Sequence, residues 1–324
     1  MKKHYLRDLE SGAVVEDEVF LVRSKTLRAA RNGTLYIELE LADRSGSMPA
    51  RYWNATREIF ESFDADSYAR VSGQLETYRD QLQMRVHSIQ PEEEANVDLV
   101  DFLPTTDKDI GGMFARLKEL VRQVHHKHLQ ALLDAFFADE EFCRALRRCP
   151  AAVQYHHAVL GGLLEHTLSV AELAAQIAPR YPNLNADLLL TGAILHDIGK
   201  IDELTSDRSF GYSDAGNLIG HLVLGVLRIE EKARQIDGFP KDILNTLRHL
   251  LLSHHGEYEY GSPKLPMSLE AVALHHLDNL DAKLSAFQQI LSQDLDPSDA
   301  WTGWSRMFER RLYKGPPKKD SDEE

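Results

Sequence analysis

The sequence predicts two domains of different kinds, a small β-barrel followed by a larger helical bundle. Residues 13–90 contain runs rich in β-branched and aromatic residues with partial alternation, which is typical of strands. From Ile110 onward the apolar residues recur at the spacing of one helix face. A chain of 324 residues with 43% hydrophobic content is long enough to bury two cores.

Five strands and one short helix are expected in the first domain, residues 1–92. Turn signals such as Arg31-Asn32-Gly33 separate the strand-like runs, and residues 56–63 between the third and fourth runs look helical. This order is that of an OB-fold barrel. The expected strands are Val14–Leu27, Gly33–Ala42, Ser47–Trp53, Tyr68–Tyr78 and Leu82–Ile89.

The rest of the chain is expected to be helical up to a polar tail. We assign residues 93–150 to a linker and a helical hairpin, residues 151–314 to the main bundle, and residues 315–324 to a disordered tail. Glycines directly after several helical runs are stop signals. The helices expected in the bundle are Tyr155–Ala178, Ala186–Asp197, Leu218–Ile236, Lys241–His254 and Ser268–Leu291.

The histidines fall in an order that indicates a metal site. Ten of the 15 histidines lie between positions 156 and 276, and the candidates recur at separations of 30, 25, 33 and 23 residues, about one helix plus its connection. Imidazoles and carboxylates from separate helices can hold a pair of divalent cations, which hydrolyse phosphate esters. The candidate ligands are His166, His196, Asp197, His221, His254, His255 and Asp278.

Within this set the ligands divide between two cations. Asp197 is the natural bridge because a carboxylate has two oxygens and can bind two cations at once. We expect His166, His196 and Asp278 around one cation. The other three histidines are expected around the second cation: His221, His254 and His255.

Three further residues join the candidate site. Lys200, three residues after Asp197, would bring an ammonium to the phosphate or the leaving group. Asp278 competes with Asp281, three residues later on the same helix face; we favour Asp278 as the ligand and Asp281 as a partner that orients a ligand. His157, about ten residues before the first ligand, could line the substrate cleft.

The net charge of −14 restricts how the protein can contact nucleic acid. Residues 1–90 hold 13 basic against 14 acidic residues, so almost all of the excess acidity belongs to the second part of the chain. An acidic protein repels a polyanion at long range, and contact must therefore come from local basic patches or bound cations.

The barrel offers such a patch. OB-folds bind single strands through aromatic platforms and a basic groove. The aromatic and basic residues expected on the strands are Tyr36, Trp53 and Tyr78 with Arg51, Arg79 and Arg85, and a second basic cluster consists of Arg23, Lys25, Arg28 and Arg31.

Other features point to an enzyme inside the cell. The longest apolar stretch near the site, Leu188–Leu195, is far below the roughly 18 residues needed to span a bilayer, and no membrane helix is expected. The N-terminal residues lack the apolar core of a signal peptide. Cys143 and Cys149 are too few for a disulfide scaffold and lack a metal-binding spacing.

The order of ligands resembles the H…HD…H…HH…D pattern of the HD-domain metal-dependent phosphohydrolases. The match is closer to one branch of that superfamily, the YhaM family of bacterial 3′→5′ exoribonucleases. The segments that carry the resemblance are Gly161–Thr167 (GGLLEHT), Leu195–Lys200 (LHDIGK), Gly220-His221, Leu252–Gly256 (LSHHG), Gly261–Lys264 (GSPK) and His276–Lys283 (HLDNLDAK).

The resemblance implies more than the residues alone. The family joins an N-terminal OB-fold to a C-terminal HD domain, so the likeness covers nearly the whole chain. It implies a cytoplasmic enzyme that uses two divalent metal ions, with Mn²⁺ favoured, and trims single-stranded RNA, and often single-stranded DNA, from the 3′ end. The direction of digestion cannot be derived from the residues, and the donor set also suits Fe, Co, Zn or Mg. A homo-oligomer remains open.

Two alternatives of different classes stay open. A cyclic-dinucleotide or nucleotide phosphohydrolase would share the ligand order, but the segment after Lys200 lacks the Gly-Tyr-Pro loop expected of the former, and the latter leaves the barrel without a role. A noncatalytic RNA-binding adaptor would be expected to have lost at least one ligand.

Overall fold

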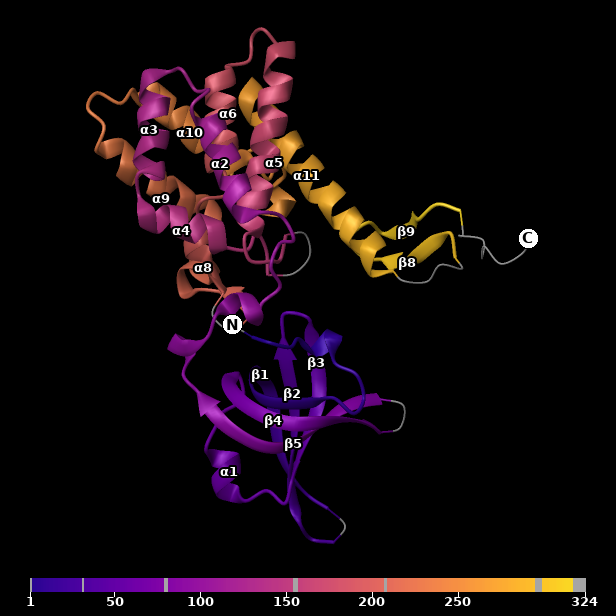
Figure 1. The fold of residues 1–324 in the computed structure, drawn as a ribbon. Coiled ribbons are helices and arrows are strands. Elements are labelled where there is room, and N and C mark those ends of the chain that lie inside the picture. The colour runs from indigo at the N-terminus through magenta and orange to yellow at the C-terminus, as the bar shows by residue number, and fades with distance from the viewer. Residues whose placement is uncertain are drawn as a thin grey trace. The chain divides into compact units, whose positions relative to one another are not determined.

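The structure is a computed structural model that describes residues 2–30, 32–78, 81–153, 157–206, 209–294 and 299–316. The chain divides into two compact units, with the main boundary between Thr105 and Thr106. Each unit is described by itself (Figure 1).

The first unit contains a closed five-stranded barrel with the strand order β1-β2-β3-β5-β4. All pairs are antiparallel except β3 with β5, which is parallel. The predicted OB-fold is thereby confirmed. The strands are β1 (Val14–Ala29), β2 (Leu35–Asp43), β3 (Gly46–Trp53), β4 (Ser67–Tyr78) and β5 (Gln81–Glu92), and helix α1 (Arg57–Glu61) lies between β3 and β4.

Alternation along the strands explains the closed barrel. Ile37, Leu39 and Leu41 of β2 are at most 2% exposed and point inward, while the residues between them are partly exposed. β1 is long enough to pair with β2 through its second half and with β4 through its first half, so it closes the barrel. The first hydrophobic core therefore lies inside the barrel.

The second unit is a helical bundle. Its helices before the HD-like segments are α2 (Ile110–Val121), α3 (Lys127–Phe137) and α4 (Glu140–Arg148). Those that follow are α5 (Gly162–Ile177), α6 (Ala186–Leu195), α7 (Lys200–Glu203), α8 (Asp214–Leu218), α9 (His221–Arg234), α10 (Lys241–Ser253) and α11 (Leu269–Gln293).

One core holds this bundle together. Leu117 of α2, Leu132 of α3 and Phe136 of α3 are fully buried in the same cluster as Leu189 of α6 and Leu250 of α10. Helices α2–α4 therefore pack as part of the bundle rather than beside it.

Several boundaries differ from those predicted. Helix α5 begins at Gly162 rather than at residue 155, after Gly161 in the left-handed conformation; residues 154–156 lie outside the described part of the chain. The helix expected over 218–236 is α9, which begins only at His221 because Gly220 has φ +80° and separates it from the short helix α8, which was not predicted.

Two short two-stranded sheets were not predicted. They are β6 (Leu204–Ser206) with β7 (Phe210–Tyr212), and β8 (Trp301–Ser305) with β9 (Arg310–Tyr313). Each strand has only three to five residues, too few for an alternating pattern to stand out in the sequence. The helical part of the chain therefore carries two added strand pairs. Residues 317–324 of the expected tail lie outside the described residues.

Among the described residues, every helix is too short or too polar to cross a lipid bilayer.

Candidate metal centre

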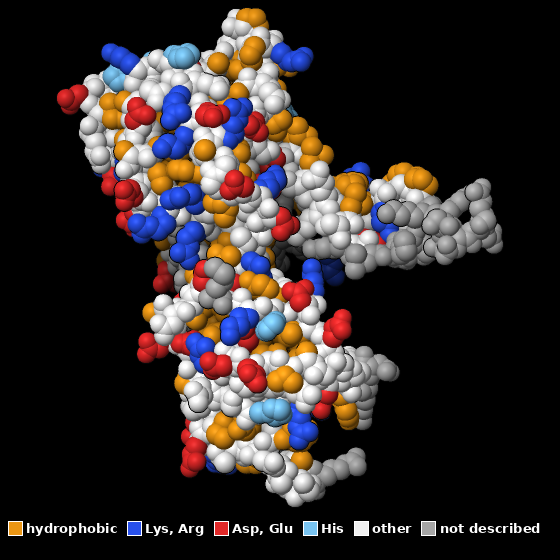
Figure 2. Space-filling model, in the orientation of Figure 1, with side chains coloured by type: hydrophobic (Ala, Val, Ile, Leu, Met, Phe, Trp, Pro, Cys, Tyr) orange, Lys and Arg blue, Asp and Glu red, His pale blue; other side chains and the backbone are white. Residues whose placement is uncertain are grey.

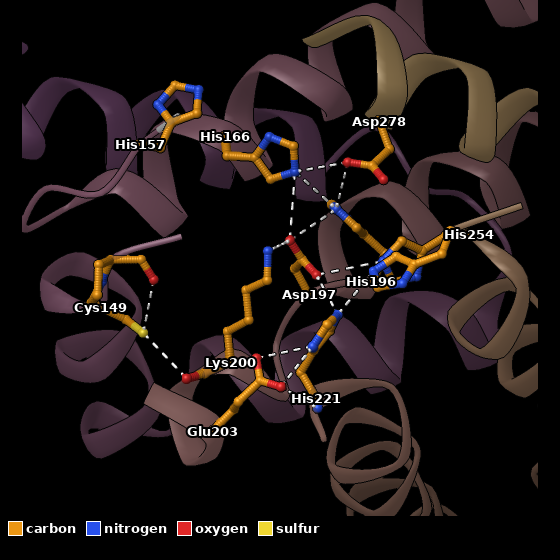
Figure 3. A network of polar contacts seen from close by, with 12 residues as sticks. Cys149, His157, His166, His196, Asp197, Lys200, Glu203, His221, His254 and Asp278 are labelled. Atoms are coloured by element: carbon orange, nitrogen blue, oxygen red, sulfur yellow. Dashed lines mark hydrogen bonds and ion pairs between the residues drawn. The ribbon is translucent and has the colours of Figure 1, made fainter. Parts of the chain in front are cut away.

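Five helices or their ends bring the predicted ligands together in the bundle. His166 lies within α5, and His196 and Asp197 follow α6 directly. His221 is the first residue of α9, whereas His254 and His255 follow α10 and Asp278 lies in α11. Figure 3 shows the side chains from these elements converging on the Asp197 carboxylate.

The first half of the site contains two imidazoles and two carboxylates. His166 Nε2 lies 3.1 Å from His196 Nε2 and 3.1 Å from Asp278 Oδ1. Asp197 Oδ2 is 3.5 Å from His166 Nε2 and 3.4 Å from His196 Nε2. These four groups therefore face one small volume.

The second half is formed by the other three histidines. His221 Nε2 lies 3.2 Å from His255 Nε2. Asp197 Oδ1 is 3.6 Å from the Nε2 atoms of both His221 and His254. The two oxygens of Asp197 thus face different halves, and the buried Oδ1 has no hydrogen-bond partner among the described residues.

All five imidazoles are held in the same way, with Nδ1 against a fixed acceptor. A backbone carbonyl accepts from Nδ1 of His196, His254 and His255, and a carboxylate lies against Nδ1 of the other two. The distances are 2.7 Å for His166 to Asp281, 2.9 Å for His196 to Ala193 O, 3.0 Å for His221 to Glu203, 2.8 Å for His254 to Leu251 O and 2.9 Å for His255 to Tyr260 O. With the proton on Nδ1, each Nε2 presents its lone pair to the centre, as metal-binding histidines do.

The arrangement of the nitrogen and oxygen atoms shows whether these residues could bind cations. The Nε2 atoms of His221 and His255, 3.2 Å apart, repel each other when both are unprotonated unless a positive charge lies between them. A divalent cation would relieve this repulsion and also satisfy the orphaned Asp197 Oδ1. The donor set of imidazole nitrogens and carboxylate oxygens suits Mn, Fe, Co or Zn. The residues present therefore fit a pair of divalent cations.

The electrostatics of the two halves differ. Burial lowers the pKa of His166, but Asp278 and Asp281 outweigh this effect and raise it to about 10. Burial dominates at His254 and lowers its pKa to about 4, and it also lowers the pKa of His255. Without metal, the first half therefore holds a proton on His166, whereas His254 and His255 in the second half are neutral.

The two competing aspartates lie against opposite nitrogens of His166. Asp278 approaches His166 on Nε2, the nitrogen that faces the centre, whereas Asp281 approaches the opposite nitrogen, Nδ1. Ser169 of α5 also donates a hydrogen bond to Asp281. This placement supports Asp278 as the ligand and Asp281 as the residue that orients His166.

Lys200 lies inside the site rather than in solvent. Its Nζ is 2.7 Å from Asp197 Oδ2, and its side chain is 14% exposed. Burial lowers the pKa of Lys200, but Asp197 outweighs burial and raises it. Asp197 in turn has a pKa well below its usual value, because Lys200 and the histidines outweigh the opposing effect of burial. The ammonium and the carboxylate therefore stay charged together.

Glu203 is a functional side chain that the sequence analysis missed. It accepts hydrogen bonds from both the backbone N–H and the Nδ1–H of His221, at 3.0 Å each. Its pKa is lowered, because the hydrogen bond and charge of His221 outweigh burial. One chemical consideration could have found it: a histidine ligand at the start of a helix needs a hydrogen-bond acceptor for its second nitrogen.

Gly199 allows the turn after Asp197 to approach α9. A Cβ at this position would lie 2.0 Å from the backbone oxygen of His221 and 2.5 Å from the backbone nitrogen of Gly225. Only a residue without a side chain permits this contact. Gly199 thus brings the Asp197 turn and His221 to their observed separation.

His157 lies behind the ligands. Its Nδ1 is 3.6 Å from Glu165 and its Nε2 is 3.4 Å from Asp281, and its side chain is 8% exposed. Glu165 also accepts a hydrogen bond from Thr106 and pairs with Lys108. The structure therefore brings His157 to the edge of the centre, in a buried network with Asp281.

The predicted nucleic-acid residues share the outer surface of the barrel. Tyr36 and Trp53 are cross-strand partners with ring centroids 4.8 Å apart, and Arg51 lies 5.2 Å from the ring of Tyr78. Arg85 is exposed on β5, in register with Arg51. The structure thus brings five of the six predicted residues onto neighbouring strands; Arg79 lies outside the described residues.

The second basic cluster is largely engaged in other contacts. Lys25 Nζ donates to the backbone oxygens of Phe60 and Phe63, next to the end of α1. Arg28 pairs with Glu38 across β1 and β2 at 2.6 Å. Arg23 remains on β1, and Arg31 lies outside the described residues. Lys25 therefore stabilises the barrel instead of offering a free charge.

Comparison with known proteins agrees with both units. The profile of the OB-fold nucleic acid binding domain matches residues 13–92, and that of the HD domain matches residues 163–283. Proteins called 3′-5′ exoribonuclease YhaM from Bacillus velezensis and Bacillus subtilis are 35% and 34% identical to the chain over 299 residues. Each alignment covers 92% of this chain and 94% of the relative. The chain belongs to the YhaM family of 3′-5′ exoribonucleases. A further member from a Geobacillus strain is 34% identical over 92% of this chain.

Membership of the YhaM family confirms the resemblance drawn from the histidine order. The HD domain match contains all seven candidate ligands, from His166 to Asp278. An HD domain implies dependence on divalent metal, in agreement with the clusters of histidine and aspartate in the bundle.

We expect metal binding to release a proton from the first half of the site. His166 has a pKa raised to about 10, so below that pH the metal-free protein holds a proton that the cation must displace. Titration of metal-free protein with Mn²⁺ at about pH 8 should release roughly one proton per protein, and release should fall as the pH rises past 10. Calorimetry in buffers of different ionisation enthalpy measures this number. A binding heat independent of the buffer would contradict the prediction.

Proposed function

We propose that this protein is a metal-dependent 3′→5′ exoribonuclease that hydrolyses phosphodiester bonds of single-stranded RNA. The observation that carries the proposal is the set of four imidazoles whose Nε2 atoms lie 3.4–3.6 Å from the two oxygens of Asp197, with His255 Nε2 3.2 Å from that of His221. Family membership supplies the polymer and the direction, since the curated relatives carry the name 3′-5′ exoribonuclease.

The ligands are assigned to two cations. His166, His196 and Asp278 would hold the first, and Asp197 would bridge both. The second would be held by His221, His254 and His255. Manganese is the proposed metal because the resemblance to the YhaM family implies it; the donor set by itself suits several divalent ions. When bound, such a pair supplies water activated for attack on phosphorus and neutralises charge on the leaving oxygen.

The protein's own groups prepare the site for this chemistry. Asp281 and Glu203 hold the Nδ1 protons of His166 and His221, which keeps both rings in one orientation. Lys200 places a charged ammonium beside Asp197, where it can donate to a phosphate oxygen or to the leaving group. No serine or cysteine nucleophile is required. Cys149 is buried, and burial raises the pKa of its thiol to about 12.

The barrel would capture the strand. Tyr36, Trp53 and Tyr78 present rings on which bases can stack, and Arg51 and Arg85 supply charge for the phosphates. These side chains are at least partly exposed on the outer surface of the barrel. Single-stranded DNA would bind the same groups, since stacking and phosphate contacts do not require the 2′-hydroxyl. We therefore assign binding to residues 1–92 and hydrolysis to the bundle.

Direction is tested with labelled RNA. Mn²⁺-loaded protein should shorten 5′-labelled single-stranded RNA to a ladder of labelled products and should release mononucleotide first from 3′-labelled RNA. Asp197→Ala should abolish both, because it removes the carboxylate between the two halves. Gel electrophoresis of both RNAs, with a cyclic dinucleotide as competing substrate, measures the outcome. Rapid opening of the cyclic dinucleotide with intact RNA would instead favour the other phosphohydrolase class.

Lys200→Ala should lower kcat by roughly 10² to 10³ while metal content stays normal. The reason is that Lys200 contributes one charged donor near Asp197 but is not among the proposed ligands. Steady-state kinetics and metal analysis on one preparation measure both quantities. Lys241→Ala, at the exposed start of α10, is the matched control. An unchanged kcat would mean that the ion pair between Lys200 and Asp197 is purely structural.

Loss of the barrel arginines should weaken capture without changing chemistry. In Arg51→Ala/Arg85→Ala, KM for long RNA should rise. The slope of log KM against log salt concentration should become shallower by about 1.4, since each lost phosphate contact removes roughly 0.7 from this slope. Hydrolysis of a dinucleotide should be unchanged. Arg57→Ala, exposed on α1 of the same barrel, is the control. An unchanged KM for long RNA would place strand capture elsewhere.

A further inference from the structure

The hairpin formed by β8 and β9 is a packed element at the end of α11. Its inner side chains are buried, with Thr302 1% and Leu312 3% exposed. Phe308 in its turn packs against Phe287 of α11, with ring centroids 5.5 Å apart. Lys314 pairs with Asp294 at 2.7 Å, next to the last turn of the helix. The hairpin lies beyond residue 283, where the match to the HD domain ends.

The outer side of this hairpin exposes three large aromatic rings. Trp301 is 45%, Trp304 is 68% and Tyr313 is 53% exposed. Trp301 and Tyr313 are cross-strand partners with centroids 5.1 Å apart. The inner face already has its own buried contacts, so these rings are not needed to complete a core. Exposed tryptophans of this kind mark a binding surface.

The hairpin is basic in an acidic protein. Residues 299–316 contain four Lys or Arg and two Asp or Glu, whereas the whole chain has a net charge of −14. Arg311 pairs with Asp299, and Lys314 is also paired. Arg306 and Arg310 are exposed, and no carboxylate of the described residues lies within ion-pair distance of either. Figure 2 shows hydrophobic and basic side chains together on this hairpin.

A groove adjoins the exposed rings. Its volume is about 500 Å³, and its lining includes Ile290 and Asp294 of the helix end with Thr302, Trp304, Arg306 and Met307 of the hairpin. This volume lies within the range of small-molecule sites, roughly 300–1,000 Å³. A tryptophan and an arginine beside backbone amides can stack on a nucleobase and contact its phosphate.

We propose that the hairpin of β8 and β9 is a second binding site for single-stranded RNA. A base stacks on Trp304, and Arg306 and Arg310 contact the adjoining phosphates. The choice of RNA as occupant rests on the proposed function. A polyanion with aromatic bases is favoured over a protein by the positive charge of the hairpin, its unpaired arginines and its exposed rings. The site differs from the barrel surface and from the metal centre.

Helix α11 links this site to the chemistry. Asp278 lies 15 residues before Gln293, the last residue of the helix, which corresponds to about 22 Å along its axis. A strand whose 3′ end lies at the metal centre can thus have a more distant, 5′ nucleotide held at the hairpin. The expected benefit is confined to substrates long enough to bridge this distance.

Binding is measured on the full-length protein without divalent cations, so that no substrate is consumed. The probe is a 5′-fluorescein oligoadenylate long enough to span α11. Its binding is measured by fluorescence anisotropy at a series of salt concentrations. Trp304→Ala should raise Kd at least roughly five-fold, the loss expected of one stacked base. Arg306→Ala/Arg310→Ala should make the slope of log affinity against log salt shallower by about 1.4. Dinucleotide hydrolysis by the metal-loaded variants should stay at the level of the unaltered protein.

Matched controls lie elsewhere on the same unit. Tyr181→Ala removes an aromatic ring that is 59% exposed, and Arg234→Ala removes an arginine whose side chain is 77% exposed. Both should bind the probe normally. Unchanged Kd and salt slope in the hairpin variants would overturn the proposal, as would equal losses in the controls. A lower assembly mass of the hairpin variants by light scattering, with unchanged Kd, would also overturn it and make the hairpin an interface between copies.

The two proposals can fail separately. If the protein does not shorten RNA but Trp304→Ala still loses binding, the exonuclease assignment fails and the hairpin site stands. If RNA is shortened normally and the hairpin variants bind the probe like the unaltered protein, only the hairpin site fails.

Discussion

The burial of one carboxylate, that of Asp197, is the constraint on which the bundle depends. Its side chain is 2% exposed, and an isolated charge at such a position would be very costly. The cost is offset by Lys200 at 2.7 Å and by imidazoles from four other positions in the chain. These partners come from separate helices. The charge of Asp197 is therefore compensated only when α5, α6, α9 and α10 pack together as they do here.

The orientation of the histidines shows how the fold meets that constraint. Two carbonyls come from the same helix end as their histidine: Ala193 serves His196, and Leu251 serves His254. The carbonyls left without intrahelical partners at a helix C-terminus are natural acceptors for such rings. His166 and His221 lie within or at the start of a helix and take carboxylates instead, Asp281 and Glu203. The local position of each histidine therefore decides which partner it needs.

The spacing of histidines sufficed to predict which side chains meet in the bundle, because histidine is rare, at 15 of 324 residues, and the candidates recur about once per helix. The barrel could also be predicted, since strand alternation and turn residues agree over residues 13–90. Glu203 and Glu165 could not, because a carboxylate in a polar stretch looks the same whether it faces solvent or a buried imidazole. Lys25 was misjudged for a similar reason: a lysine that caps the end of α1 has the sequence context of one that binds phosphate. The hairpin of β8 and β9 escaped notice because its strands are short and its exposed tryptophans obscure the alternation.

The charge distribution explains how an acidic protein can act on a polyanion. Part of the acidity of the bundle lies within the candidate site, where Asp197, Asp278, Asp281 and Glu203 are paired with imidazoles or an ammonium. Divalent cations would turn this acidic centre into a positive one, so at this centre attraction for phosphate arises only in the loaded enzyme. Elsewhere, exposed charges more than about 8 Å apart are largely screened at physiological ionic strength, so the attraction of a strand depends on nearby charges. Small patches such as Arg51 with Arg85 can therefore attract a strand despite the net charge of the whole chain.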